Sequence, residues 1–207
     1  MTEPVTGNRA PAQQRKKRLV VKPIPTFTTV AAAALLVVLG GAVLYAHAQD
    51  NDKYSLKSPG GIAFSDFRGY EDWSVVSSAR MEAALPDEIL KVIVGNPVMI
   101  KAYKAGVPGN GQVFPEGSMI VKLQWKPKKS TEAPFAVDVP DVFKQAFVME
   151  KDSKRFPKTG GWGYAVFNYD AASDKFTPDP TALADCGNSC HMAVKAKDYI
   201  FHPYQKR

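Results

Sequence analysis

Two cysteines and a histidine near the carboxyl end form the most chemically distinctive pattern in the sequence. Cys186 and Cys190 are the only cysteines of the chain, and His191 follows directly, in the run CGNSCH. The spacing C-x-x-x-C-H is one residue longer than the haem-attachment motif C-x-x-C-H. Two thiols can add across the two vinyl groups of a haem while a neutral imidazole binds the iron. Positions four apart share one face of a helix, so we expect both sulfur atoms to face one covalently bound haem c.

Three other uses of these residues stay open at this point. A disulfide between Cys186 and Cys190 is permitted in an oxidising compartment, although it closes a very short loop and leaves His191 without a role. A thiol–disulfide exchange site would more naturally be C-x-x-C at the start of a helix in a βαβ setting, which this sequence lacks. A metal site of two cysteines and one histidine has no evident fourth ligand nearby.

Strands upstream of the motif must build the pocket, because only residues 192–207 follow His191. Turn signals bound five segments rich in β-branched and aromatic residues, which predict strands at residues 72–77, 90–95, 118–125, 144–149 and 162–169. Asn96 and Pro97 predict the start of a helix that runs to Ala105, ahead of a Gly/Pro loop. Asp179 and Pro180 predict the start of a short helix that leads into the motif. The expected fold class is mainly β (α+β), an antiparallel sheet with a few helices and a C-terminal haem-attachment helix.

An apolar segment near the amino end indicates export. Residues 30–48 carry no charged side chain, and as a helix they would be about 28 Å long, enough for the hydrocarbon core of a bilayer. The basic cluster at residues 15–18 precedes this transmembrane or signal helix, so the positive-inside rule places the following chain on the periplasmic side of a bacterial inner membrane. The segment either stays as a membrane anchor or is cleaved after Ala48, where residues 46–48 fit a signal-peptidase site.

Charge and composition divide the chain into four parts. We expect a basic cytoplasmic tail at residues 1–29, the anchor or signal segment at 30–48, a linker at 49–60 and one haem c domain at 61–207. The formal net charge is +7, from 27 Lys and Arg against 20 Asp and Glu. Six of those basic residues and one acid precede residue 49, so the remainder is nearly neutral. A basic nucleic-acid-binding face is therefore excluded.

Five short motifs follow one another between residues 64 and 203. They are Gly95-Asn96-Pro97 with the following helix, Phe114-Pro115-Glu116-Gly117-Ser118 leading into Val121-Lys122, the run at 151–156, Gly160-Gly161-Trp162-Gly163, and the late Cys/Cys/His. In order and spacing they resemble the cytochrome P-460 family, which includes the cytochrome c′-beta proteins. The resemblance implies a small antiparallel β-sheet domain, often a homodimer, with one haem c, His191 as proximal iron ligand and an open opposite face. Members oxidise hydroxylamine or bind small gases such as nitric oxide.

The resemblance also singles out Lys122, since hydroxylamine-oxidising members join a lysine covalently to the haem edge. Alternation along a strand places Lys122 on one face with Ile120 and Gln124, opposite an apolar face. From this pattern alone Lys122 would be a solvated lysine. If Lys122 instead faces the haem, the face that carries Ile120 and Gln124 is the haem side.

The expected distal carboxylate of the oxidising members is missing. The strand after the Gly-Gly-Trp motif reads Tyr-Ala-Val-Phe at residues 164–167, without an acid. An apolar pocket offers no base for removing protons from a substrate nitrogen, which counts against hydroxylamine oxidation, whereas neutral diatomic gases need no charge compensation. The candidate walls of the distal pocket, each of which also suits an ordinary core, are Phe147, Trp162, Tyr164 and Phe167.

The sequence thus predicts an exported mono-haem c-type cytochrome that binds or redox-converts a small nitrogen species at an open iron site. Whether it is an enzyme stays open, and its redox partner is unknown. One alternative is a six-coordinate electron-transfer cytochrome that uses Met149 or His202 as the second iron ligand. The other is a non-haem exported binding domain with a Cys186–Cys190 disulfide. The lysine-rich stretch at residues 126–129 reads as a solvated loop or as a docking face for an acidic redox partner.

Overall fold

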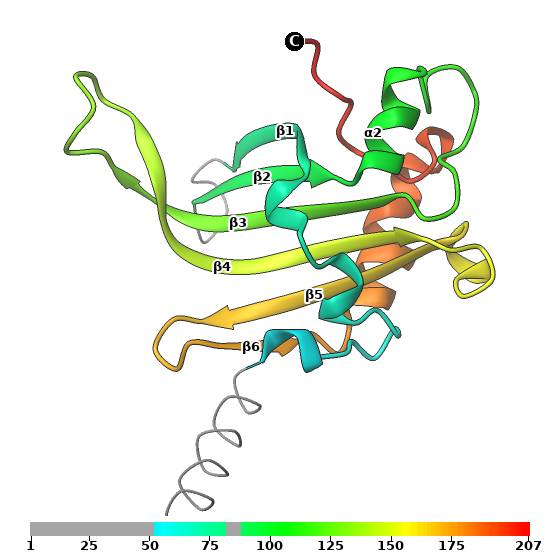
Figure 1. Ribbon diagram of the computed structural model, residues 1–207, viewed down its shortest axis with the longest axis horizontal. Helices are drawn as coiled ribbons and strands as arrows, with labels where there is room; N and C mark the ends of the chain where they lie inside the picture. Colours follow the sequence, from blue (N-terminus) through cyan, green and yellow to red (C-terminus); the bar gives the residue numbers. More distant parts are fainter. Residues whose placement is uncertain (1–51, 82–87) are drawn as a thin grey trace, which may run out of the picture. The chain divides into compact units, whose positions relative to one another are not determined.

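Six antiparallel strands form one sheet in which each strand pairs with the next along the chain (Figure 1). The computed structural model describes residues 52–81 and 88–207. The strands are β1 (Ser74–Met81), β2 (Ile89–Gly95), β3 (Met119–Lys129), β4 (Asp138–Lys151), β5 (Trp162–Asp170) and β6 (Lys175–Pro178). The mainly β, antiparallel prediction is confirmed. The expected tail at 1–29, the apolar segment at 30–48, the cleavage site after Ala48 and the start of the linker lie outside the described residues. Within the described ranges, no helix is long and apolar enough to cross a bilayer.

Short helices connect and cover the strands. Three 3₁₀ turns precede the sheet at Lys53–Ser55, Phe64–Phe67 and Tyr70–Asp72, and another lies at Pro157–Thr159. The helix α2 spans Pro97–Lys104 and starts at Asn96 as predicted, because Asn96 Oδ1 accepts the backbone N–H of Met99 at 2.9 Å. After β6 come η5 (Leu183–Cys190), a π-helix, and η6 (His191–Lys197), a 3₁₀ helix.

Two expectations about short elements need correction. The Asp179 carboxylate does accept the Thr181 N–H at 2.8 Å, but the helix begins at Leu183, with Ala182 as its N-cap, a few residues later than predicted. The lysine-rich stretch at 126–129 is not a loop, since it is the end of β3. There Lys128 pairs with Asp141 at 3.1 Å and Lys129 pairs with Asp138 at 2.7 Å. The β3–β4 hairpin therefore extends as an arm beyond the end of β2, with its lysines matched to acids across the strands (Figure 1).

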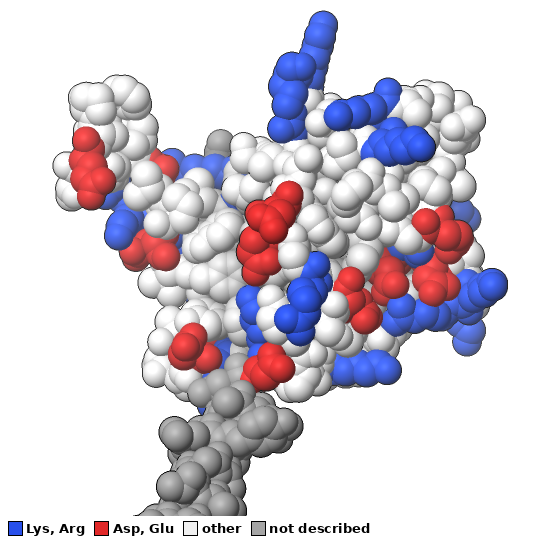
Figure 2. Space-filling view, in the orientation of Figure 1, with Lys and Arg blue, Asp and Glu red and all other residues white. Residues whose placement is uncertain are grey.

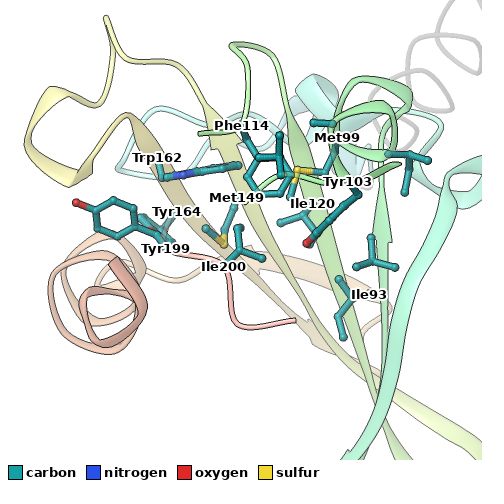
Figure 3. Close-up of a cluster of buried hydrophobic side chains, with 14 residues drawn as sticks. Ile93, Met99, Tyr103, Phe114, Ile120, Met149, Trp162, Tyr164, Tyr199 and Ile200 are labelled. Carbon is teal, nitrogen blue, oxygen red and sulfur yellow. The ribbon is translucent and has the colours of Figure 1, made fainter. Parts of the chain in front are cut away.

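The sheet separates two buried clusters, because side chains alternate between its faces. One cluster packs α2 and the C-terminal segment against the strands (Figure 3) and contains Ile93, Met99, Tyr103, Phe114, Ile120, Met149, Trp162, Tyr164, Tyr199 and Ile200. The other packs the amino-terminal 3₁₀ turns against the opposite face and contains Ile62, Phe64, Phe67, Val121, Val148, Ala165 and Phe167. β5 is buried over its first six residues since both layers cover it.

Charged side chains of both signs are interspersed on the surface. On the face that Figure 2 shows, lysines and arginines alternate with aspartates and glutamates over the sheet and its connections. This mixture agrees with the nearly neutral charge that the sequence assigns to the part of the chain after residue 48. On the face shown, no single sign of charge dominates.

Candidate functional site

A cavity of about 890 Å³ lies between the sheet and the C-terminal segment. Strands β2, β3, β4 and β5, with Met81 at the end of β1, supply one side, while η5, the start of η6 and residues 200–202 supply the other. The predicted site residues that line it are Lys122, Phe147, Tyr164, Cys186, Cys190 and His191. Met149 and His202, the two alternative iron ligands, line it as well.

Two predicted pocket walls lie elsewhere. Phe167 belongs to the cluster on the opposite face of the sheet, since it is an odd number of residues from Tyr164 on the same strand. Trp162 is fully buried on the cavity side of the sheet, but it packs against Phe114 and donates its indole N–H to Asp198 at 3.2 Å instead of lining the cavity. Phe147 and Tyr164 are therefore the aromatic cavity walls among the four candidates.

Strand register arranges the sheet side of the cavity into three rows across the strands. The first row is apolar apart from one hydroxyl and consists of Ile120, Met149 and Tyr164. The middle row consists of Ile93, Lys122 and Phe147, and the third, polar row consists of Lys91, Gln124 and Gln145. Successive rows are two residues apart along each strand, so the first and third lie about 13 Å apart. The cavity wall thus changes from apolar to polar along the strands.

His191 lies near the apolar row. Its ring packs 5.0 Å from the ring of Tyr164 and 4.8 Å from that of Phe201, measured between centroids. The Nδ1 atom is 2.6 Å from the carbonyl oxygen of Tyr199. Because a carbonyl oxygen only accepts, Nδ1 carries the proton and Nε2 keeps a lone pair for a metal. Burial lowers the pKa of His191, which favours the neutral form of the ring.

The π-helix η5 absorbs the extra residue of the C-x-x-x-C-H motif. The backbone N–H of His191 donates to the carbonyl of Cys186, five residues back, where an α-helix would use a residue four back. A π-turn therefore holds one residue more than an α-turn. In C-x-x-C-H the first cysteine and the histidine are one α-turn apart, and here Cys186 and His191 are one π-turn apart. Sequence reasoning missed this turn, because it assumed ordinary helical periodicity.

Gly187 is a positioning residue that sequence reasoning also missed. It is buried, and a Cβ atom at this position would lie 2.7 Å from Cδ2 of Tyr164. Atoms cannot approach so closely without displacement, so only glycine lets the first turn of η5 pack directly on β5. The available signal was a glycine placed directly after the first cysteine of the motif.

Both thiols are free in the structure, Cys186 half-buried and Cys190 exposed. Burial raises the pKa of the Cys186 thiol. Among residues 52–81 and 88–207, no three His, Cys, Asp or Glu side chains are grouped closely enough to hold a bare metal ion. The arrangement of Cys186, Cys190 and His191 therefore does not match a Cys₂His site for a single ion.

Lys122 lies in the cavity wall, on the face that it shares with Ile120 and Gln124. Its Nζ atom is 3.7 Å from the centroid of the Phe147 ring, a cation–π contact. Burial, with Lys91 as a second cause, lowers the pKa of Lys122 to about 8. Within the described part of the chain, no aspartate or glutamate lines this cavity. The structure thus places a poorly solvated cation, and no carboxylate, on the sheet side.

Comparison with known proteins identifies the family. No curated protein matches the chain. The family model described as Cytochrome P460 matches residues 67–202, which is more than half of the 207-residue chain and includes every cavity residue named above. The chain therefore belongs to the cytochrome P460 family, whose cofactor is haem.

Proposed function

We propose that this chain is a mono-haem c-type cytochrome that binds a small nitrogen species, such as nitric oxide or hydroxylamine, at the iron face opposite His191. Cys186 and Cys190 would form the two thioether bonds, and His191 would be the proximal iron ligand. The observation that carries the proposal is the juxtaposition of both thiols and an imidazole with a free Nε2 around one cavity. Family membership supports the haem, and the cavity supports its place.

The volume, apolar wall and donor atoms of the cavity fit a haem. Its volume of about 890 Å³ lies in the upper part of the range for cofactor pockets, roughly 300–1,000 Å³. Ile93, Ile120 and Met149 give it an apolar wall, as a porphyrin ring requires. Its donor set contains the imidazole of His191, whose Nδ1 atom is held by the Tyr199 carbonyl, as is usual for a metal-binding histidine.

The side chains around the cavity favour ligand binding over proton-coupled oxidation. Haem, when bound, supplies a redox-active iron with the His191 side occupied. Among the described residues, the cavity wall contains no carboxylate to accept the protons of hydroxylamine. Lys122, with its pKa lowered to about 8, can exchange a proton only near that pH. A neutral diatomic gas makes no demand for such a base, so nitric oxide is the better match.

The sequence and the family resemblance support further proposals about export, partners and covalent linkage. Residues 30–48 support export across a bacterial inner membrane, as an anchor or as a leader cleaved after Ala48. A redox partner would have to supply or accept electrons at the haem. The family resemblance supports a homodimer and a covalent bond from Lys122 to the haem edge.

The full chain, matured with a c-type haem assembly system, tests the proposal. Intact mass spectrometry should give the polypeptide plus one haem, and the absorption spectrum should change on addition of nitric oxide or carbon monoxide. The Cys186→Ala/Cys190→Ala variant should lose the covalent haem, and His191→Ala should lose the wild-type spectrum. A wild-type chain that is colourless and has only the polypeptide mass would overturn the proposal.

Two cavity variants separate the alternatives. His202→Ala and Met149→Ala should leave a spectrum that still responds to carbon monoxide, since neither side chain is needed as an iron ligand. A low-spin, six-coordinate wild-type spectrum that ignores both gases would instead establish the electron-transfer alternative. A red-shifted ferrous Soret band that disappears in Lys122→Ala would establish the lysine cross-link.

A further inference from the structure

Three lysines line the cavity without an acidic partner. Lys91, Lys122 and Lys144 all contribute to its wall, and none of them forms an ion pair with another residue in the ranges 52–81 and 88–207. On the β3–β4 hairpin arm, by contrast, Lys128 and Lys129 each pair with an aspartate. Ammonium groups around a partly desolvated cavity repel one another. A negatively charged ligand relieves this repulsion, so its binding there is favourable.

The three lysines are not equivalent. Lys122 lies in the middle row, against the face of Phe147. Lys91 lies in the polar row, next to Gln124 across the β2–β3 pair. Lys144 lies beside Gln145, where the β3–β4 register shifts between Gln124 and Trp125. Two of the three cations are therefore gathered at the polar end of the cavity, about 13 Å along the strands from the row that contacts His191.

A pair of amides completes this polar end. Gln145 Nε2 donates to Gln124 Oε1 at 2.8 Å, and Gln124 is buried, so the two side chains are held in the wall. This bond leaves the Gln124 amide nitrogen with its hydrogen atoms available for an acceptor. Two ammonium groups and an amide donor form a set that suits carboxylate oxygens.

Haem has the complementary distribution of charge, since it is an apolar macrocycle with two propionate carboxylates on one edge. We propose that Lys91 and Lys144, with the Gln124–Gln145 amide pair, form a carboxylate subsite that binds the haem propionates. This inference rests on the proposed function, since it presupposes haem in the cavity. It adds the orientation of the ligand, with the dianionic edge at the polar row and the apolar edges toward Ile120 and Met149.

Haem and its dimethyl ester, in which the propionates carry no charge, provide the test. The probes are titrated into the full chain with Cys186→Ala/Cys190→Ala, so that binding is non-covalent and its affinity can be measured. With the lysines intact, ferric haem should bind at least about tenfold tighter than the ester, a difference of roughly 1.4 kcal/mol. In Lys91→Gln/Lys144→Gln the preference should fall below about threefold. Lys104→Gln, an exposed lysine on α2 outside the cavity, should keep the full preference.

The outcomes separate this inference from the proposed function. Equal affinity for haem and its ester with all lysines intact would overturn the carboxylate subsite and leave haem binding standing. A matured wild-type chain without a haem would overturn the proposed function itself. If the thiol-free chain does not fold, the covalently matured protein serves instead, with resonance Raman of the propionate bending modes as the readout. Lys91→Gln/Lys144→Gln should shift these modes and Lys104→Gln should not, and unshifted modes in the double variant would overturn the subsite.

Discussion

The imidazole of His191 is oriented by one backbone carbonyl, that of Tyr199, and the conformation of that residue is unusual. Asp198 and Tyr199 both have positive φ angles, 47° and 65°, which cost free energy in residues other than glycine. The surrounding contacts offset this cost. The buried Asp198 carboxylate accepts the Lys151 ammonium at 3.0 Å, the Trp162 indole N–H at 3.2 Å and the Phe114 backbone N–H at 2.7 Å. A buried ion pair thus fixes the backbone that holds the candidate iron ligand.

Removing the charge of Asp198 should therefore lower the stability of the fold. Asp198→Asn leaves the Lys151 ammonium buried without a counter-charge, so we expect the free energy of unfolding to fall by about 3–5 kcal/mol. Urea unfolding of the haem-free chain measures the change. Asp141→Asn is the matched control, because Asp141 pairs with Lys128 on the exposed hairpin arm and should contribute no more than about 1 kcal/mol. Equal losses in the two variants would contradict the anchoring role of Asp198.

Lys122, in the middle row of the cavity wall, should make the free energy of unfolding depend on pH. The pKa of Lys122 falls from its ordinary value of 10.5 to about 8 in the folded chain. Between these values the unfolded chain holds a proton that the folded chain lacks, so stability through this group rises from about pH 8 to about pH 10.5. Lys122→Met keeps an unbranched side chain without the charge.

We expect Lys122→Met to be more stable than the wild-type chain at pH 7 and to lose that rise. Urea unfolding of the haem-free chains at several pH values gives both quantities. Lys104→Met, on the exposed face of α2, should leave the wild-type dependence unchanged. If the free energy of unfolding of Lys122→Met rose with pH as steeply as that of the wild type, the Lys122 ammonium would have to be well solvated in the folded state.

Helix η5 shows how an element can adapt to an irregular motif. A π-turn is an α-turn with one residue inserted, and it occurs frequently at functional sites. Here it keeps Cys186 and His191 one turn apart in spite of the longer spacing. Gly187 lets this wider turn lie against Tyr164, where any side chain would collide.

Deletion of Ser189 tests this account of the spacing. The deletion restores C-x-x-C-H, and we expect the π-turn to close into an α-turn without displacing the elements on either side. The matured variant should then keep one haem by mass spectrometry, with Tm within a few degrees of the wild type. Deletion of Ala102, a buried residue inside the regular helix α2, should rotate the rest of that helix and abolish folding. A folded Ser189 deletion variant without haem would contradict the account.

The elements that could be predicted from the sequence are those with a clear composition or capping signal. β-Branched and aromatic residues between turn signals predicted the first five strands, and an Asn-Pro pair predicted the start of α2. Alternation along β5 could also have shown that Tyr164 and Phe167 face opposite sides of the strand, so both cannot line one pocket. Strand β6 has only four residues, Lys175–Pro178, too few for a pattern. The three cavity rows depend on how neighbouring strands pair residue by residue. This register cannot be read from the local sequence of any one strand.

At the scale of the whole molecule, the sheet divides the described chain into a cavity side and a structural side. Phe64 lies at the centre of an aromatic cluster on the structural side and is fully buried. Its ring centroid is 4.5 Å from that of Phe67, 4.9 Å from that of Phe167 and 5.1 Å from that of Phe176. None of these four aromatic residues lines the cavity. The aromatic cluster therefore supports the back of the strands whose front faces carry the cavity rows.

This division predicts that stability and the haem environment can be changed separately. Phe64→Ala should lower the free energy of unfolding by about 3–5 kcal/mol, because it leaves a cavity among aromatic rings. Its absorption spectrum should nevertheless match the wild type at temperatures where it stays folded. Met149→Ala, on the cavity side of β4, should cost about 2–5 kcal/mol and also alter the haem spectrum. A Phe64→Ala spectrum that differs from the wild type would mean that the sheet transmits packing changes from one face to the other, since strands such as β5 are buried on both.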